Sequence, residues 1–99
     1  MSKMHWSKPR AQELLWALRR CDGSATTRQL AAMVGSTALH TDASSLRCYL
    51  EANGYSREAL SCQHERTTDR NRRVYRYHLD PDVVQSELPD REPAVSMAQ

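Results

Sequence analysis

Apolar residues recur with a helical period in the first part of the chain. Between residues 9 and 20 they return every three or four positions, which predicts a helix with one buried face. Pro9 suits its first turn because a proline's missing N–H has no helical partner there, and Asp22-Gly23 ends it. The inner face is expected to hold Ala11, Leu14, Leu18 and Cys21. Trp16 lies outside that stripe and is expected to be exposed.

Residues 26 to 54 predict two further helices joined by a tight turn. Thr26 or Thr27 can cap the first, because a threonine oxygen accepts a hydrogen bond from an unpaired backbone N–H. Gly35 can end it in a left-handed conformation. Asn53-Gly54 stops the second helix. The buried stripe of the second helix is expected to be Ala43, Leu46, Tyr49 and Leu50.

The opposite face of that second helix is polar and has no carboxylate before Glu51. Carboxylates would be repelled by phosphate, so a face of this kind can enter a DNA major groove. An ordinary solvated face explains the same pattern equally well. The residues on this face are Ser44 and Cys48, flanked by Thr41, Ser45 and Arg47.

After Tyr55 the period changes from helical to alternating. Residues 59–65 place Leu60, Cys62 and His64 on one side, and residues 74–79 place Tyr75, Tyr77 and Leu79 on one side. Residues 66–73, RTTDRNRR, lie between these two expected strands and contain no large apolar side chain. They predict a hairpin loop that carries Arg66, Arg70, Arg72 and Arg73 against one acidic residue, Asp69. Residues 23–25 are expected to be a short extended segment.

The two ends of the chain lack both periods. Residues 1–8 are expected to form a flexible N-terminal arm, unless Trp6 docks on the core. Residues 80–99 hold three of the four prolines and five acidic residues, so an acidic disordered tail is expected, with at most a transient helical turn at Val83-Val84. The remaining residues, 9–79, are expected to form one domain, which suits a 99-residue chain with 39% apolar residues.

Charge divides the chain in the same way. Residues 1–78 contain thirteen lysines and arginines against seven acidic residues, a net charge of +6, whereas residues 79–99 carry −4. Only two of the fourteen basic residues are lysines, and the planar arginine side chain suits phosphate and guanine edges. Polyanions are therefore the first partners to expect.

Several other functions are not favoured. The three cysteines have no paired spacing and fit a reducing cytoplasm. With no secretory signal or 18-residue apolar run, a membrane partner is not expected. A zinc site built from Cys62, His64, His40 and His78 would lack the two close ligand pairs usual for structural zinc, so neither a metal nor a cofactor is expected. No catalytic triad or carboxylate pair stands out, so the chain is not expected to be an enzyme.

Helix, short strand, helix, turn, helix and basic hairpin is the order of elements in winged helix-turn-helix domains, and the sequence resembles that family over about Pro9 to Leu79. The resemblance is carried by T-x-x-x-L-A at residues 26–31, Gly35, the ending L-x-x-Y-L-E-A-N-G-Y at residues 46–55, and V-Y-R-Y-H-L at residues 74–79. It implies an α+β fold of three helices followed by a two-stranded wing. The turn 36–40 is longer than in the shortest bacterial versions, so the start of the third helix is left open.

The resemblance also implies a function. The expected activity is sequence-specific binding of double-stranded DNA by a small bacterial or phage transcriptional regulator, cytoplasmic and nucleoid-associated when bound. A homodimer through Trp16 is expected, and a protein-interaction adaptor is the alternative; RNA binding and a zinc module rank below both. The residues implied to contact DNA are Arg28, Thr41, Ser44, Ser45, Arg47, Cys48, Arg66, Arg70, Arg72 and Arg73.

Overall fold

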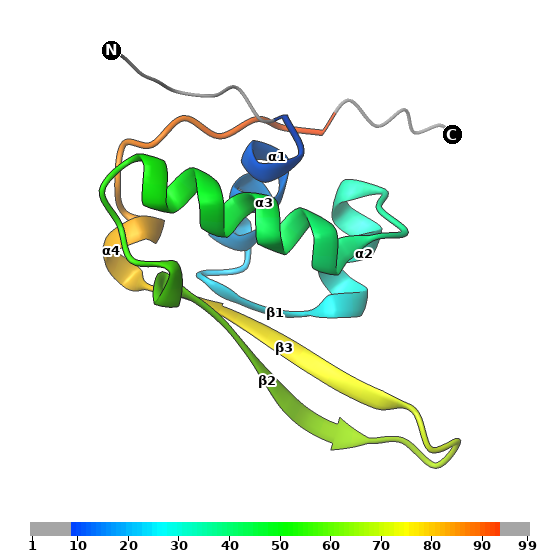
Figure 1. Ribbon diagram of the computed structural model, residues 1–99. Helices are drawn as coiled ribbons and strands as arrows, with labels where there is room; N and C mark the ends of the chain where they lie inside the picture. The colour runs from blue at the N-terminus through cyan, green and yellow to red at the C-terminus, as the bar shows by residue number, and fades with distance from the viewer. Residues whose placement is uncertain (1–8, 94–99) are drawn as a thin grey trace.

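The protein combines helices with a three-stranded antiparallel sheet. A computed structural model describes residues 9–93. The helices lie against one side of the sheet, and one end of the sheet extends beyond them as a hairpin (Figure 1). The elements in order are α1 (Pro9–Arg20), β1 (Ser24–Thr26), α2 (Thr27–Val34), α3 (Leu39–Ala52), the 3-10 turn η1 (Arg57–Ala59), β2 (Leu60–Thr67), β3 (Arg73–Leu79) and α4 (Pro81–Val84).

Local signals in the sequence set the ends of α2. The Thr26 side chain accepts a hydrogen bond from the backbone N–H of Gln29, and the Gln29 side chain accepts one from the backbone N–H of Thr26. This reciprocal pair satisfies two donors that the first helical turn leaves unpaired. Gly35 follows with φ of 63°, the left-handed conformation in which glycine has no steric penalty. The predicted cap and stop of this helix are confirmed.

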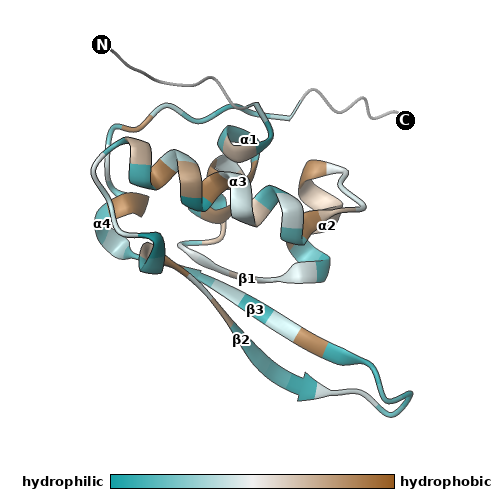
Figure 2. Ribbon diagram, in the orientation of Figure 1, coloured by the Kyte–Doolittle hydropathy of each residue, from teal (hydrophilic) through white to brown (hydrophobic). Residues whose placement is uncertain are grey.

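The core lies where α1 and α3 pack on each other and on the sheet. The expected stripes are confirmed at Leu14 and Leu18 of α1 and at Leu46 and Leu50 of α3, which are fully buried. Cys21, also expected on the inner face of the first helix, lies after the end of α1 and is only half-buried. The sheet contributes Tyr77, which is 1% exposed. α3 begins at Leu39, inside the turn whose length the sequence left open. The distal half of β2, in contrast, is hydrophilic (Figure 2), so the hairpin extends beyond the core.

The hairpin contains one irregularity. β3 is the central strand and pairs with β1 on one side and β2 on the other. Along β2, His64 pairs with Tyr75 and Arg66 pairs with Val74, so Glu65 is an extra residue without a partner position on β3. This is a β-bulge, which locally bends and twists a strand. The strands also reach further than expected, and the loop between them is only residues 68–72.

The segment after β3 corrects the sequence-based expectation. Residues 80–93, which we call the strap, run from α4 past the end of α3 to α1 (Figure 1). Val83 is fully buried, and the Arg19 guanidinium donates hydrogen bonds to the backbone oxygens of Ser86 and Leu88. The prediction of a disordered tail is therefore wrong for residues 80–93. Residues 94–99 and the expected arm at residues 1–8 lie outside the described residues.

The element counts differ from the expectation in two ways. α4 adds a fourth, short helix, and β1 joins the hairpin to make three strands instead of two. β1 pairs through Ala25, which lies opposite Tyr77 and is itself buried. The α+β class is confirmed at this coarser level.

Candidate nucleic-acid interface

The outward face of α3 is only partly as expected. Thr41 and Ser44 are exposed, whereas Ser45, Arg47 and Cys48 are half-buried. The Arg47 Nε donates to the backbone oxygen of Leu60 at 3.1 Å, which ties α3 to the start of β2. Thr41 and Ser44 are therefore the predicted α3 residues most accessible to a ligand, and Arg47 also has a structural role.

His40 connects this helix face to the sheet. Its Nδ1 lies 2.8 Å from the hydroxyl of Tyr77. Burial, followed by the nearby Cys62 thiol, raises the pKa of Tyr77 to about 12. The hydroxyl is therefore protonated near neutral pH and can donate to Nδ1, which leaves the proton of a neutral imidazole on Nε2. The exposed edge of His40 thus offers an N–H donor.

Two further rings continue the surface from His40 onto the hairpin. The Tyr75 ring centroid is 6.4 Å from that of His40, and the His64 ring centroid is 5.6 Å from that of Tyr75. Tyr75 is half-buried and His64 is exposed. Ser44 lies one helical turn after His40 on α3, so Ser44, His40, Tyr75 and His64 follow one another from the helix to the hairpin. We call these four residues the ring surface.

The hairpin tip is an ordered turn. The Thr68 N–H donates to the Arg72 carbonyl at 2.8 Å, and the Asn71 N–H donates to the Thr68 carbonyl at 2.9 Å. Asn71 has φ of 62°, a left-handed conformation that asparagine adopts more readily than most residues. The tip thus presents its arginines from a defined backbone.

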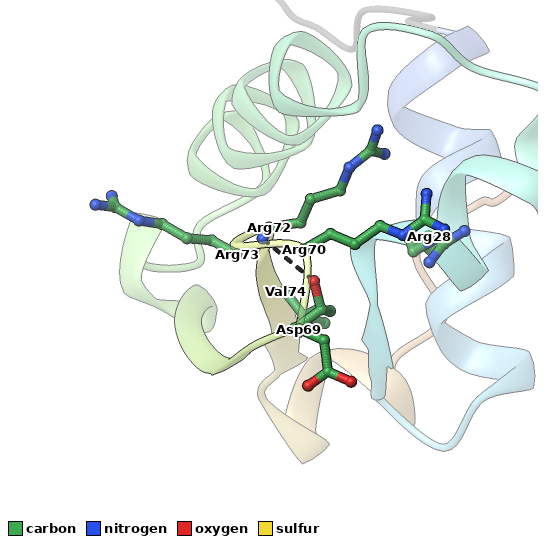
Figure 3. Close-up of a pocket in the computed structure, with 7 residues that line it drawn as sticks. Arg28, Asp69, Arg70, Arg72, Arg73 and Val74 are labelled. Carbon is green, nitrogen blue, oxygen red and sulfur yellow. Dashed lines mark hydrogen bonds between the residues drawn. The ribbon is translucent and has the colours of Figure 1, made fainter.

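A groove of about 560 Å³ separates the hairpin tip from the start of α2. The side chain of Arg70 points toward Arg28 across this groove, and the Asp69 carboxylate points away from both (Figure 3). Arg73 points in the opposite direction from Arg70. The lining residues are Arg28, Thr68, Asp69, Arg70, Arg72, Arg73 and Val74.

The arginines of the hairpin differ in their counter-charges. Glu65 pairs with Arg76 and, at 3.1 Å, with Arg66. The hydrogen bond from Arg76, followed by the other cations nearby, lowers the pKa of Glu65, so this carboxyl is ionised at neutral pH. Arg66 is thus partly neutralised, which the sequence did not reveal. Within residues 9–93, no ion pair involves the arginines that line the groove, Arg28, Arg70, Arg72 and Arg73.

The opposite end of the sheet has the opposite charge. A hollow of about 370 Å³ there is lined in part by Asp22, Glu58 and Asp80. Its carboxylates would repel phosphate, whereas the tip would attract it. The two ends of the sheet therefore differ in the sign of their charge.

The exposure of Trp16 is lower than expected. Its side chain is half-buried and packs against the core cluster, and the Arg20 guanidinium lies 5.2 Å from its ring centroid. The prediction of an exposed aromatic residue is wrong, because the ring packs against the core and Arg20 covers part of it. A dimer through this residue stays a prediction.

Sequence reasoning missed His40, His64 and Tyr75 as site residues. For two of them the sequence held a signal, since the alternating pattern placed His64 on the Leu60 side of β2 and Tyr75 on the Tyr77 side of β3. The pattern does not show where the helices stop covering that face. Where the hairpin extends past the helices, side chains on the core side of the strands, such as His64, are exposed to solvent.

No family model, curated protein or solved structure matches this chain. Function is therefore inferred from the geometry above. Within residues 9–93, no helix is long and apolar enough to cross a membrane. In the same part of the chain, no group of three or more His, Cys, Asp or Glu side chains is placed to hold a metal ion.

Proposed function

We propose that the protein is a winged helix-turn-helix protein that binds double-stranded DNA in a sequence-specific way and acts as a small transcriptional regulator. In this proposal α3 enters the major groove, with Ser44 and Thr41 toward the base edges. The β2–β3 hairpin is the wing and contacts the phosphate backbone or the minor groove. The ring surface connects α3 to the wing, through the contacts of His40 with Tyr75 and Tyr77.

The observation that carries this proposal is the continuity between the polar face of α3 and a hairpin with unpaired arginines. His40 contacts Tyr77 of β3 directly, so the helix and the hairpin form one surface and not two separate ones. At its far end Arg70, Arg72 and Arg73 have no carboxylate partner among the described residues. A duplex carries one phosphate charge per roughly 1.7 Å of axis, so it can neutralise these charges while releasing counterions.

A genomic selection tests specificity first. Fragmented DNA is incubated with the full-length protein at physiological salt, and the co-purifying fragments are sequenced. One enriched motif supports the proposal. No enrichment over bulk DNA contradicts it and favours the alternative, a protein-interaction adaptor.

Base reading is tested with Ser44→Ala. Ser44 is exposed, and within residues 9–93 its side chain makes no hydrogen bond, so the fold should tolerate the change. Specific binding should weaken by about 1 to 3 kcal/mol, while non-specific binding changes less. Arg47→Ala is less informative, because it also removes the hydrogen bond to Leu60. If Ser44→Ala and Thr41→Ala both bind the selected site as tightly as wild type, α3 is not the reading element.

The wing is tested by the salt dependence of binding. Replacing Arg70, Arg72 and Arg73 together by alanine should flatten the slope of log affinity against log salt by about two to three units. Specific and non-specific sites should weaken alike. Arg20→Ala, on α1, is the control for loss of an exposed arginine outside the wing, and its slope should match wild type. An unaltered slope in the triple variant would overturn the role of the wing.

A further inference from the structure

The groove between α2 and the hairpin tip has the features of a phosphate site in its own right. Arg28 enters it from the first turn of α2, and Arg70 and Arg72 enter it from the tip. These guanidinium groups have no ion-pair partner in the described part of the chain. Because their charges have the same sign, an anion that enters the groove would be attracted by all three.

The groove is also built in advance of any ligand. Besides the two backbone hydrogen bonds of the turn, the Arg72 N–H donates to the Thr68 Oγ1 at 3.2 Å (Figure 3). Val74, only 6% exposed, forms part of the wall. Since the backbone is already ordered, binding has to order only the arginine side chains.

We propose that this groove binds two adjacent phosphate groups and bridges α2 to the hairpin through them. Arg28 lines the groove from α2 and Arg70 lines it from the tip, so a chain of two phosphates lying in the groove can accept hydrogen bonds from both sides. The volume of about 560 Å³ leaves room for a second phosphate beside Arg72. Arg73 also lines the groove, but its side chain points the opposite way from that of Arg70 (Figure 3), so we assign it no phosphate.

Two sources can supply this chemistry. One is the backbone of a duplex, which makes the groove part of the proposed DNA site. The other is a free oligophosphate, such as the chain of a nucleoside triphosphate. The groove does not distinguish them, so a free oligophosphate competes with DNA for Arg28 and Arg70. The DNA source rests on the proposed function, whereas oligophosphate binding does not.

The experiment uses the full-length protein and inorganic tripolyphosphate as the probe. Backbone amide resonances are followed by NMR at low salt, and the affinity is measured by calorimetry. Shifts are expected at Arg28 and residues 68–74. Arg28→Ala and Arg70→Ala should each weaken binding by roughly tenfold, as the loss of a charge-assisted hydrogen bond implies. Arg20→Ala should leave the affinity unchanged, and a wild-type pattern of dispersed resonances confirms that each variant is folded.

A short duplex is then added to the tripolyphosphate complex. Displacement of the probe shows that the two share the groove. If tripolyphosphate binds there but no duplex binds, the groove stands and the DNA function fails. A different result is that the duplex binds, but Arg28→Ala and Arg70→Ala weaken the binding of tripolyphosphate and of the duplex no more than Arg20→Ala does. In that case the groove proposal is wrong and the DNA function remains supported. Shifts spread over every arginine-bearing surface, without a preference for the groove, also overturn the proposal.

Discussion

Arg19 holds the strap to the body of the protein, and replacing it by alanine is the strongest test of that packing. Its guanidinium donates to Leu88 O at 2.8 Å and to Ser86 O at 2.9 Å, and weaker contacts reach Ser86 Oγ and Val83 O. It also pairs with Asp90 at 2.9 Å. Only 17% of the Arg19 side chain is exposed, so these bonds are shielded from water.

The expected loss follows from these contacts. A hydrogen bond to a charged group contributes about 1.5 to 3 kcal/mol, but bonds that share one side chain are not additive. After the substitution, water can enter the space that the guanidinium leaves and hydrate the released strap oxygens, which offsets part of the loss. We therefore expect Arg19→Ala to lower the free energy of unfolding by about 2 to 4 kcal/mol. Asp90→Ala removes only a pair whose carboxylate is 31% exposed and should cost less than about 1 kcal/mol.

Urea unfolding followed by circular dichroism measures this loss, and amide hydrogen exchange locates it. The Arg91 N–H donates to the Gln12 carbonyl at 3.2 Å, so its exchange should be slow in wild type and fast in Arg19→Ala. Arg19→Lys should recover less than half of the loss, because one ammonium cannot replace a fork with several donors. A loss below about 1 kcal/mol with unchanged Arg91 exchange would refute this account of the strap.

Three further changes test local features. Thr26→Ala removes the α2 cap and should cost about 1 kcal/mol in urea unfolding, with Thr26→Ser close to wild type. Gly23→Ala should cost more than Gly35→Ala: both have positive φ, but the new Cβ at Gly23 would lie 2.9 Å from Val84 Cγ2, whereas the one at Gly35 meets open space. The pKa of Tyr77 is about 12 folded against about 10 unfolded, so the unfolded state releases its proton first and stability falls between pH 10 and 12. Thermal melts of Tyr77→Phe should show a smaller fall over that range than wild type.

The sequence predicted the parts of the fold that depend on neighbours along the chain. The stripes of α1 and α3 and the cap at Thr26 each rest on residues within one or two helical turns, where spacing alone fixes the geometry. The strap was missed because Arg19 bonds to residues 64 to 71 positions away. The sequence of residues 80–93 has no periodicity that would predict hydrogen bonds from Arg19 to their main-chain oxygens. Composition alone indicated disorder there.

The candidate site was predicted in the same uneven way. The exposure of Ser44 and the arginine-rich tip follow from helical spacing and from the lack of apolar residues. The tether of Arg47 to Leu60 and the neutralisation of Arg66 by Glu65 depend on distances between elements, which the sequence does not contain. The groove also depends on such a distance, because Arg28 and Arg70 are far apart along the chain.

The bulge at Glu65 has a consequence for how copies of this protein behave at high concentration. β2 is an edge strand of eight residues, and its outer side offers unpaired backbone groups to any other extended chain. The bulge interrupts the regular spacing of those groups midway along the strand, and Glu65 and Arg66 place charges beside them. A second strand adding to this edge would have to match the irregularity and dehydrate the charges. The bulge therefore protects the hairpin against edge-to-edge aggregation, even though the hairpin extends into solvent without a covering helix.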